Sequence, residues 1–254
     1  MSYELILIFI VIGIFTGLIS SFFGIGGGLF LVPILLYFDF DIKDAIFISI
    51  FQMIFSSIYG SVLNFRNNSI STVMIKKIYS IFIGAFSGAI FSAFIILNTH
   101  NLILKYIFIL ILIFSIFRIY LANRSIQIIN ISHKIVMNKI ILFIVGFSIA
   151  MLSITIGIGG SILVIPFLIS FIQYDLKKAT SVGLFFVIFT SIPTFSLLFS
   201  SNYILLKYGF IIGISSLFGV FLGIKYKNIV DLKLYRKYIL YFYIAIFILM
   251  IYKI

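Results

Sequence analysis

Residues Gly17–Leu36 read GLISSFFGIGGGLFLVPILL, and residues Ala150–Ile169 read AMLSITIGIGGSILVIPFLI. The same glycine-rich pattern therefore occurs twice, and every matched position of the second copy follows the first by one constant offset. Clustered glycines and prolines interrupt helices. The sequence therefore predicts a broken helix at the same place in each half of the chain. The matched positions are Gly24, Gly26, Gly27 and Pro33 in the first copy, and Gly157, Gly159, Gly160 and Pro166 in the second.

The composition places these motifs in a membrane. The chain has 254 residues, of which 63% are hydrophobic and only 9% are charged, and its mean hydropathy is +1.33. Soluble domains have about 25% charged residues. Each motif lies inside a long uncharged run, Leu5–Phe38 or Ile140–Tyr174. Both runs exceed the roughly 20 residues of one crossing helix. Each run should therefore contain a helix followed by a re-entrant or returning segment.

The remaining uncharged runs predict an all-α polytopic membrane protein. They divide the chain into a first transmembrane repeat at 1–122, a basic inter-repeat loop at 123–138 and a second transmembrane repeat at 139–254. Each repeat is predicted to hold one re-entrant segment and three transmembrane helices. The runs are Ala45–Phe65, Ile78–Leu104, Tyr106–Phe117, Ala179–Leu206, Tyr208–Leu222 and Tyr238–Tyr252.

The basic residues choose between two topologies. If each long run crosses the membrane once, the 18 Lys and Arg residues divide evenly between the two sides. If each long run returns to its own side, Lys43, Lys105, Lys207 and Lys253 lie on one side and all the others on the opposite side. The second arrangement satisfies the positive-inside rule. It gives three crossings per half, so the two repeats should be inverted relative to each other, with both termini outside the cytoplasm.

Small residues at every fourth position predict close helix packing. Gly84, Gly88 and Ser92 follow this spacing in the first half, and Ser215, Gly219 and Gly223 follow it in the second. These faces are interpreted as packing surfaces.

Several function classes are excluded by what the sequence contains. The net charge of +12 belongs to short loops that set topology, so no nucleic acid is expected as a partner. The chain has no Cys and only two isolated histidines, His100 and His133, so no metal site is expected. No catalytic constellation and no cofactor motif lies in a predicted span, and no enzyme is predicted. The six carboxylates fall at run ends or in loops, which argues against a buried carboxylate proton carrier.

The helix breaks are the candidate binding site. A helix that begins after a glycine cluster presents free N–H groups and a partial positive charge, which suits an anion. Gln52 and several hydroxyls lie near the breaks or on the following helices, where they can bind an oxyanion or satisfy the broken backbone. The predicted substrate-binding residues are Gly24, Gly26, Gly27, Gly28, Gly157, Gly159, Gly160, Ser161, Ser21, Gln52, Ser49, Thr155 and Ser181, with Pro33 and Pro166 as structural residues of the helix breaks.

The doubled Gly-x-Gly-Gly-Gly/Ser-x4-Pro motif, the duplication and the length resemble the TauE/SafE family of sulfite exporter-like membrane proteins. The resemblance covers nearly the whole chain and implicates the glycines and prolines of both motifs. It implies transport of sulfite, sulfoacetate or other small organosulfur or carboxylate anions. Ala179-Thr180-Ser181 is similar to a segment of the family, whereas Ala45-Ile46-Phe47 departs from it and leaves Ser49 as the nearest hydroxyl.

The sequence thus predicts a secondary transporter of a small anion, with export as the expected direction, in a bacterial-type plasma membrane. Its expected partners are the anionic substrate and the lipid bilayer, and a homo-oligomer is left open. A passive anion channel or facilitator and a membrane scaffold without transport are the alternatives. Substrate identity, coupling ion and oligomeric state do not follow from the sequence.

Overall fold

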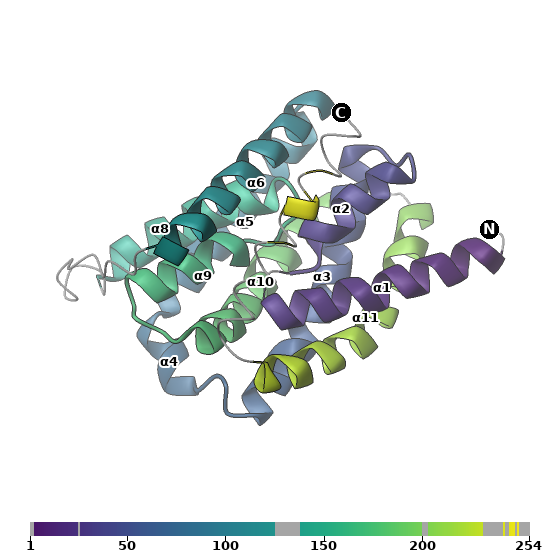
Figure 1. The fold of residues 1–254 in the computed structure, drawn as a ribbon. Helices are drawn as coiled ribbons and strands as arrows, with labels where there is room; N and C mark the ends of the chain where they lie inside the picture. The colour runs from purple at the N-terminus through teal and green to yellow at the C-terminus, as the bar shows by residue number, and fades with distance from the viewer. Residues whose placement is uncertain are drawn as a thin grey trace.

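A computed structural model describes residues 3–24, 26–124, 138–199 and 203–230, together with 241, 244–246 and 248; the side chains of 115–124, 203, 204 and 228 are outside this description. Throughout this part of the chain the regular secondary structure is helical (Figure 1). The helices are α1 (Tyr3–Phe23), α2 (Gly28–Tyr37), α3 (Ile42–Arg66), α4 (Thr72–Lys77), α5 (Tyr79–Asn98), α6 (Asn101–Arg124), α8 (Lys139–Ile154), α9 (Ser161–Ser170), α10 (Leu176–Leu198) and α11 (Tyr203–Ile229).

Five of the helices in the described residues are long and apolar enough to cross a membrane: α1, α3, α5, α10 and the Leu205–Lys227 part of α11. Large apolar side chains such as Phe91 and Leu110 are more than half exposed, as expected for a surface that faces lipid. The predicted all-helical polytopic membrane protein is therefore confirmed. The first helices of the two repeats differ in length. The α1 helix has 21 residues and is long enough to cross a membrane, whereas its counterpart α8 has 16 residues.

The helix order repeats in the two halves. In the first half α1, the break, α2 and α3 follow one another, and in the second half α8, the break, α9 and α10 do so. The α2 and α9 helices both have ten residues. Residues 125–137, most of the predicted inter-repeat loop, and most of the run Tyr238–Tyr252 lie outside the described residues.

Each broken segment packs against a helix of the other half. The α1 helix lies along α11, and α8 lies along α5. Glycines bring the backbones together: Gly219 lies against the Ile14 carbonyl of α1, and Gly88 lies against the Phe147 carbonyl of α8. These contacts are equivalent in the two halves. They confirm that the small-residue faces of α5 and α11 are packing surfaces.

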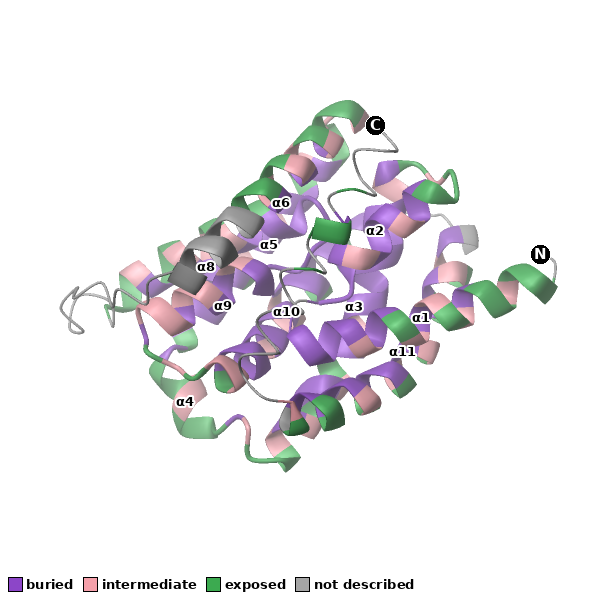
Figure 2. Ribbon diagram, viewed as in Figure 1, coloured by how far each residue is buried: buried purple, intermediate pink, exposed green. Residues whose placement is uncertain are grey.

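The α3 and α10 helices cross in the interior, between the two broken segments. They run antiparallel, because Phe47 stacks on Phe195 near one end and Asn64 meets Ser181 near the other. Most residues of α2, α3 and α10 are buried, whereas the outer faces of α1, α5 and α6 are exposed (Figure 2). The glycine motifs therefore lie at the centre of the protein, as their position in lipid requires.

Candidate functional site

The helix breaks occur at the predicted glycines. Gly24 and Gly26 have φ of 70° and 75°, and Gly157 and Gly159 have φ of 73° and 86°. This left-handed backbone suits glycine and strains other residues. Pro33 and Pro166 lie inside α2 and α9. The glycines, and not the prolines, therefore make the breaks.

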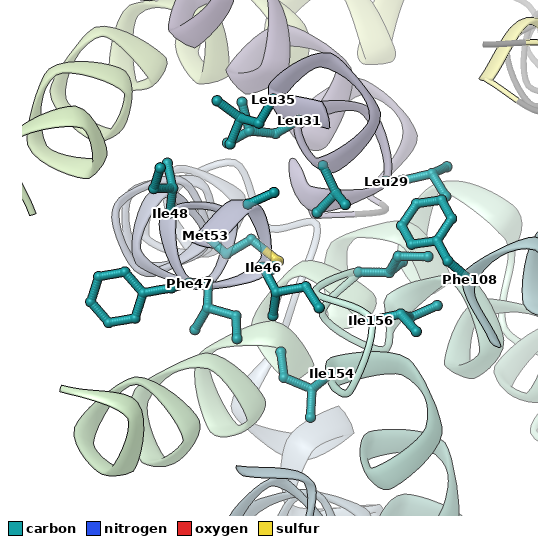
Figure 3. Close-up of a cluster of buried hydrophobic side chains, with 14 of the residues drawn as sticks. Leu29, Leu31, Leu35, Ile46, Phe47, Ile48, Met53, Phe108, Ile154 and Ile156 are labelled. Carbon is teal, nitrogen blue, oxygen red and sulfur yellow. The ribbon is translucent and has the colours of Figure 1, made fainter. Parts of the chain in front are cut away.

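The two breaks pack directly against each other. The Cα of Gly28 lies so close to the Gly157 carbonyl that a Cβ would overlap it, and a Cβ on Gly26 would lie 3.1 Å from the Ile158 carbonyl. Met53 of α3 contacts both breaks, since Cβ atoms on Gly26 and Gly159 would lie 3.1 Å and 2.6 Å from its Sδ. Figure 3 shows Met53 and Ile46 beside Ile154 and Ile156 in the same buried cluster. The two sequence motifs, one from each half of the chain, thus form one structural unit.

Hydroxyl groups of α3 and α10 satisfy the backbone of the second break. Ser49 Oγ donates to the Gly157 carbonyl at 2.9 Å, and Thr190 Oγ1 donates to the Gly159 carbonyl at 2.8 Å. Phe51–Ser57 (FQMIFSS) of α3 aligns with Phe185–Ser191 (FFVIFTS) of α10, so at the first break the position equivalent to Ser49 is Gly183, which has no hydroxyl. A Cβ on Gly183 would lie 3.3 Å from the Gly24 carbonyl. The second break is therefore more completely hydrogen-bonded by side chains than the first.

Gln52 is the main polar group at the first break. Its side chain lies against Gly27, is fully buried, and has no hydrogen-bond partner for either Oε1 or Nε2. The equivalent residue at the second break is Phe186, whose ring would lie 2.6 Å from a Cβ on Gly160. A buried amide without partners costs about 1–3 kcal/mol. This cost is unusual for a residue whose role is only to fill space.

Other buried hydroxyls near the breaks also have no partner. Ser20 on α1 and Ser153 on α8 occupy equivalent positions one turn before the breaks, and the Oγ atoms of both are buried and unpaired. The same is true of Ser161 Oγ in the first turn of α9. No side chain caps the N-terminus of α2 or α9. Unpaired donors thus accompany both uncapped helix ends.

Two of the predicted substrate-binding residues are hydrogen-bonded to a neighbouring helix. Ser21 Oγ donates to the Val220 carbonyl of α11 at 3.0 Å, and is also within hydrogen-bond distance of carbonyls in its own helix. Thr155 Oγ1 pairs with Ser92 Oγ of α5 at 2.8 Å. Both side chains therefore have partners in another helix and do not resemble the unpaired groups near the breaks.

Ser181 lies in a different polar cluster, which the sequence did not predict. Lys227 Nζ donates to Asn64 Oδ1 at 3.0 Å and to Ser181 Oγ at 2.7 Å. The topology prediction placed Lys227 in a basic loop, but it lies within α11 and is 1% exposed. One feature of the sequence indicates this position: Lys227 continues the four-residue spacing of Ser215, Gly219 and Gly223, which face the protein interior.

These features define a class of protein. An all-helical polytopic membrane protein whose two broken helices meet in the interior has the architecture of secondary transporters. The chain belongs to the TauE/SafE family, because the family model described as "Sulfite exporter TauE/SafE" matches residues 9–250.

A relative in Methanocaldococcus jannaschii has the same type of description. It is named a "probable membrane transporter protein" and is 31% identical in sequence, over 85% of this chain and 84% of the relative. No solved structure matches the chain. The family resemblance that the glycine motifs indicated is thus confirmed, and the protein is a membrane transporter of this family.

Proposed function

We propose that the chain is a secondary transporter that exports a small anion, with sulfite or an organosulfonate as the substrate class. The observation that carries this proposal is Gln52, a fully buried amide with no partner at the uncapped N-terminus of α2. The Nε2 group can donate two hydrogen bonds to an oxyanion. The binding residues would be Gln52 and the glycine backbone of the first break.

The surroundings of the first break favour an anion over a cation. Helix N-termini carry partial positive charge, and exposed backbone N–H groups bind oxyanions. The unpaired hydroxyls of Ser20, Ser153 and Ser161 offer further donors on the same two broken segments. The description of the matching family names sulfite, a small oxyanion of this kind.

The close packing of the breaks bears on the mechanism. Because Gly28 abuts the Gly157 carbonyl, this conformation leaves no room for an anion between them. The two broken segments must separate to admit the substrate. Each broken segment is packed on a helix of the other half, so movement of one half against the other would open the site to one side at a time. This arrangement favours a carrier over an open channel.

Flux measurements test the proposal. Purified protein in liposomes should transport labelled sulfite with a saturable rate and show counterflow with unlabelled sulfite. Gln52→Met should reduce the flux at least tenfold, whereas Phe186→Met at the equivalent position is the matched control and should retain most of it. Sulfonates and carboxylates are then tested as competitors. Non-saturable flux without counterflow would indicate a channel, and unchanged flux in Gln52→Met would overturn the site.

We also infer that the two halves are inverted across the membrane, with the more basic side in the cytoplasm. The antiparallel course of the equivalent helices α3 and α10 supports this inference. Because the chain has no Cys, single cysteines report on one site each. Asp41 and Asp175, exposed residues before α3 and α10, make no side-chain cap bond and can be replaced.

In intact cells, an impermeant maleimide should label Asp41→Cys. It should label Asp175→Cys only after the membrane is opened. Labelling of both from the same side would contradict the inverted arrangement.

A further inference from the structure

Lys227 is a buried basic residue inside the helix bundle. Its exposed fraction is 1%, and its two neighbours Asn64 and Ser181 are fully buried. They come from three helices: Asn64 from α3, Ser181 from α10 and Lys227 from α11. Besides the two bonds from Lys227, Ser181 Oγ lies 3.1 Å from Asn64 Oδ1 and 2.9 Å from the Lys177 carbonyl. The three side chains therefore form one connected cluster.

Among the described residues, the cluster has hydrogen-bond donors without a partner and contains no carboxylate. In its protonated form Lys227 has three N–H donors, and two of them are directed to Asn64 and Ser181. Asn64 Nδ2 is buried and has no partner, so its two N–H donors are free. One N–H of Lys227 and two of Asn64 thus remain. Donors beside a positive charge form a site for an anion.

Among the described residues, no carboxylate pairs with Lys227. The carboxylate of Asp175 pairs with Lys178 instead. Buried charges in proteins are normally paired, because leaving one unpaired costs several kcal/mol. Asp231, four positions after Lys227 in the sequence, lies outside the described residues, so its effect on Lys227 has to be tested by substitution.

The cluster adjoins the first break. Thr180, next to Ser181, packs on Gly24, and Gly223, one turn before Lys227, packs on Ser21 near the end of α1. An anion at the cluster would therefore lie next to the start of the first break. This position links the buried charge to the glycine site by neighbouring residues of α1, α10 and α11.

We propose that Lys227, Asn64 and Ser181 form an anion-binding subsite, which holds a small oxyanion of the transported class beside the first break. This proposal rests on the proposed function. The Lys227 ammonium supplies the charge, Asn64 Nδ2 donates to the oxyanion, and Ser181 positions both groups. The substrate thus meets a basic side chain in a membrane interior where the described groups near the breaks are uncharged donors.

Binding of labelled sulfite to the purified full chain in detergent tests the subsite. Lys227→Gln should weaken binding at least tenfold and abolish the rise in melting temperature that sulfite gives the wild type. Lys225→Gln removes an exposed charge from the same helix and is the matched control, expected to bind like the wild type. Wild-type binding by folded Lys227→Gln would overturn the proposal.

Asn64→Asp provides a test that does not depend on removing the lysine. It places an internal carboxylate beside Lys227 Nζ, so it should raise the melting temperature and abolish sulfite binding. Lys227→Gln combined with Asp231→Asn addresses the alternative that the lysine only neutralises Asp231. Recovery of binding in this double variant, or unchanged binding in Asn64→Asp, would contradict the subsite.

The outcomes for the two proposals are distinguishable. If the wild type neither binds nor transports sulfite, sulfonates or carboxylates, the proposed function is wrong. A different pattern would show that only the subsite is wrong. In that pattern the wild type transports an anion and Gln52→Met does not, while Lys227→Gln and Lys225→Gln both behave like the wild type.

Discussion

The two glycine breaks share left-handed backbone at two equivalent pairs of glycines. They differ at the third pair, where Gly27 has φ of −65° and Gly160 has φ of 90°, and in their side-chain chemistry. In both, left-handed glycines end a long helix, and a ten-residue helix follows. At the first break a buried, unpaired Gln52 lies against Gly27, whereas at the second a phenyl ring from Phe186 lies against Gly160. Side-chain hydroxyls bond two carbonyls of the second break.

This difference indicates a division of roles between the halves. Unpaired buried hydroxyls lie near both breaks, but among the described residues only the first break has an unpaired buried amide, that of Gln52. Because two carbonyls of the second break accept side-chain hydrogen bonds, we infer that this break supports the first. Four predictions test this comparison, from the largest expected effect to the smallest.

The largest effect is expected at Gly160, whose φ is 90°. Left-handed backbone strains a residue that carries a side chain. A leucine would collide with Phe186 at Gly160 and with Gln52 at Gly27, so overpacking affects both positions. Gly160→Leu should therefore abolish transport and lower the melting temperature more than Gly27→Leu does, because Gly27 has an ordinary φ of −65°. Thermal melting in detergent measures both. A Gly160→Leu protein as stable as Gly27→Leu would contradict the proposed support role.

The second effect is an opposite change in stability when the side chains at the equivalent positions 52 and 186 are replaced. Gln52→Met removes an unpaired buried amide and should stabilise the protein by about 1–3 kcal/mol while transport falls. Phe186→Gln introduces such an amide at the second break and should destabilise the protein by a similar amount. Melting temperatures of both variants, measured without substrate, test the comparison. Destabilisation by Gln52→Met would show that the amide has a structural partner.

A smaller loss is expected from Ser49→Ala. The substitution removes the hydrogen bond to the Gly157 carbonyl. Side-chain hydrogen bonds between membrane helices contribute about 0.6 kcal/mol on average, and the strongest contribute more. The melting temperature should fall, and the affinity for sulfite should change less than twofold. Thr190→Val, which removes the bond to Gly159, is the matched variant at the same break. A large change in affinity with unchanged stability would instead place Ser49 in the binding site.

The smallest effect is expected from Ser21→Ala. This hydroxyl is fully hydrogen-bonded between α1 and α11, away from the unpaired groups near the breaks. Its loss should cost about 0.6 kcal/mol, the average for such bonds in a membrane protein, and leave transport within twofold of the wild type. Flux in liposomes is the measurement. A tenfold loss of flux in a folded variant would show that Ser21 belongs to the binding site.

The sequence predicted the location of the breaks and the packing faces, but it did not predict which groups the hydroxyls near the breaks contact. Gly24, Gly26, Gly157 and Gly159 have the special backbone that their repetition indicated. Ser21 and Thr155 lie close to the breaks in sequence, yet their hydroxyls bond to α11 and α5. Proximity along the chain does not decide which way a helical side chain points, because the direction depends on where the neighbouring helix lies.

The sequence alone determined that the chain lies in a membrane, that its halves are duplicated, and where each helix breaks. These properties follow from composition and from the backbone preferences of glycine, which act locally. Only the tertiary structure decided that the two breaks meet, that Gln52 lies against the first break and Phe186 against the second, and that Lys227 is buried with Asn64 and Ser181. Those facts depend on contacts between helices that are far apart in the sequence, and such contacts are set by how the helices pack against each other.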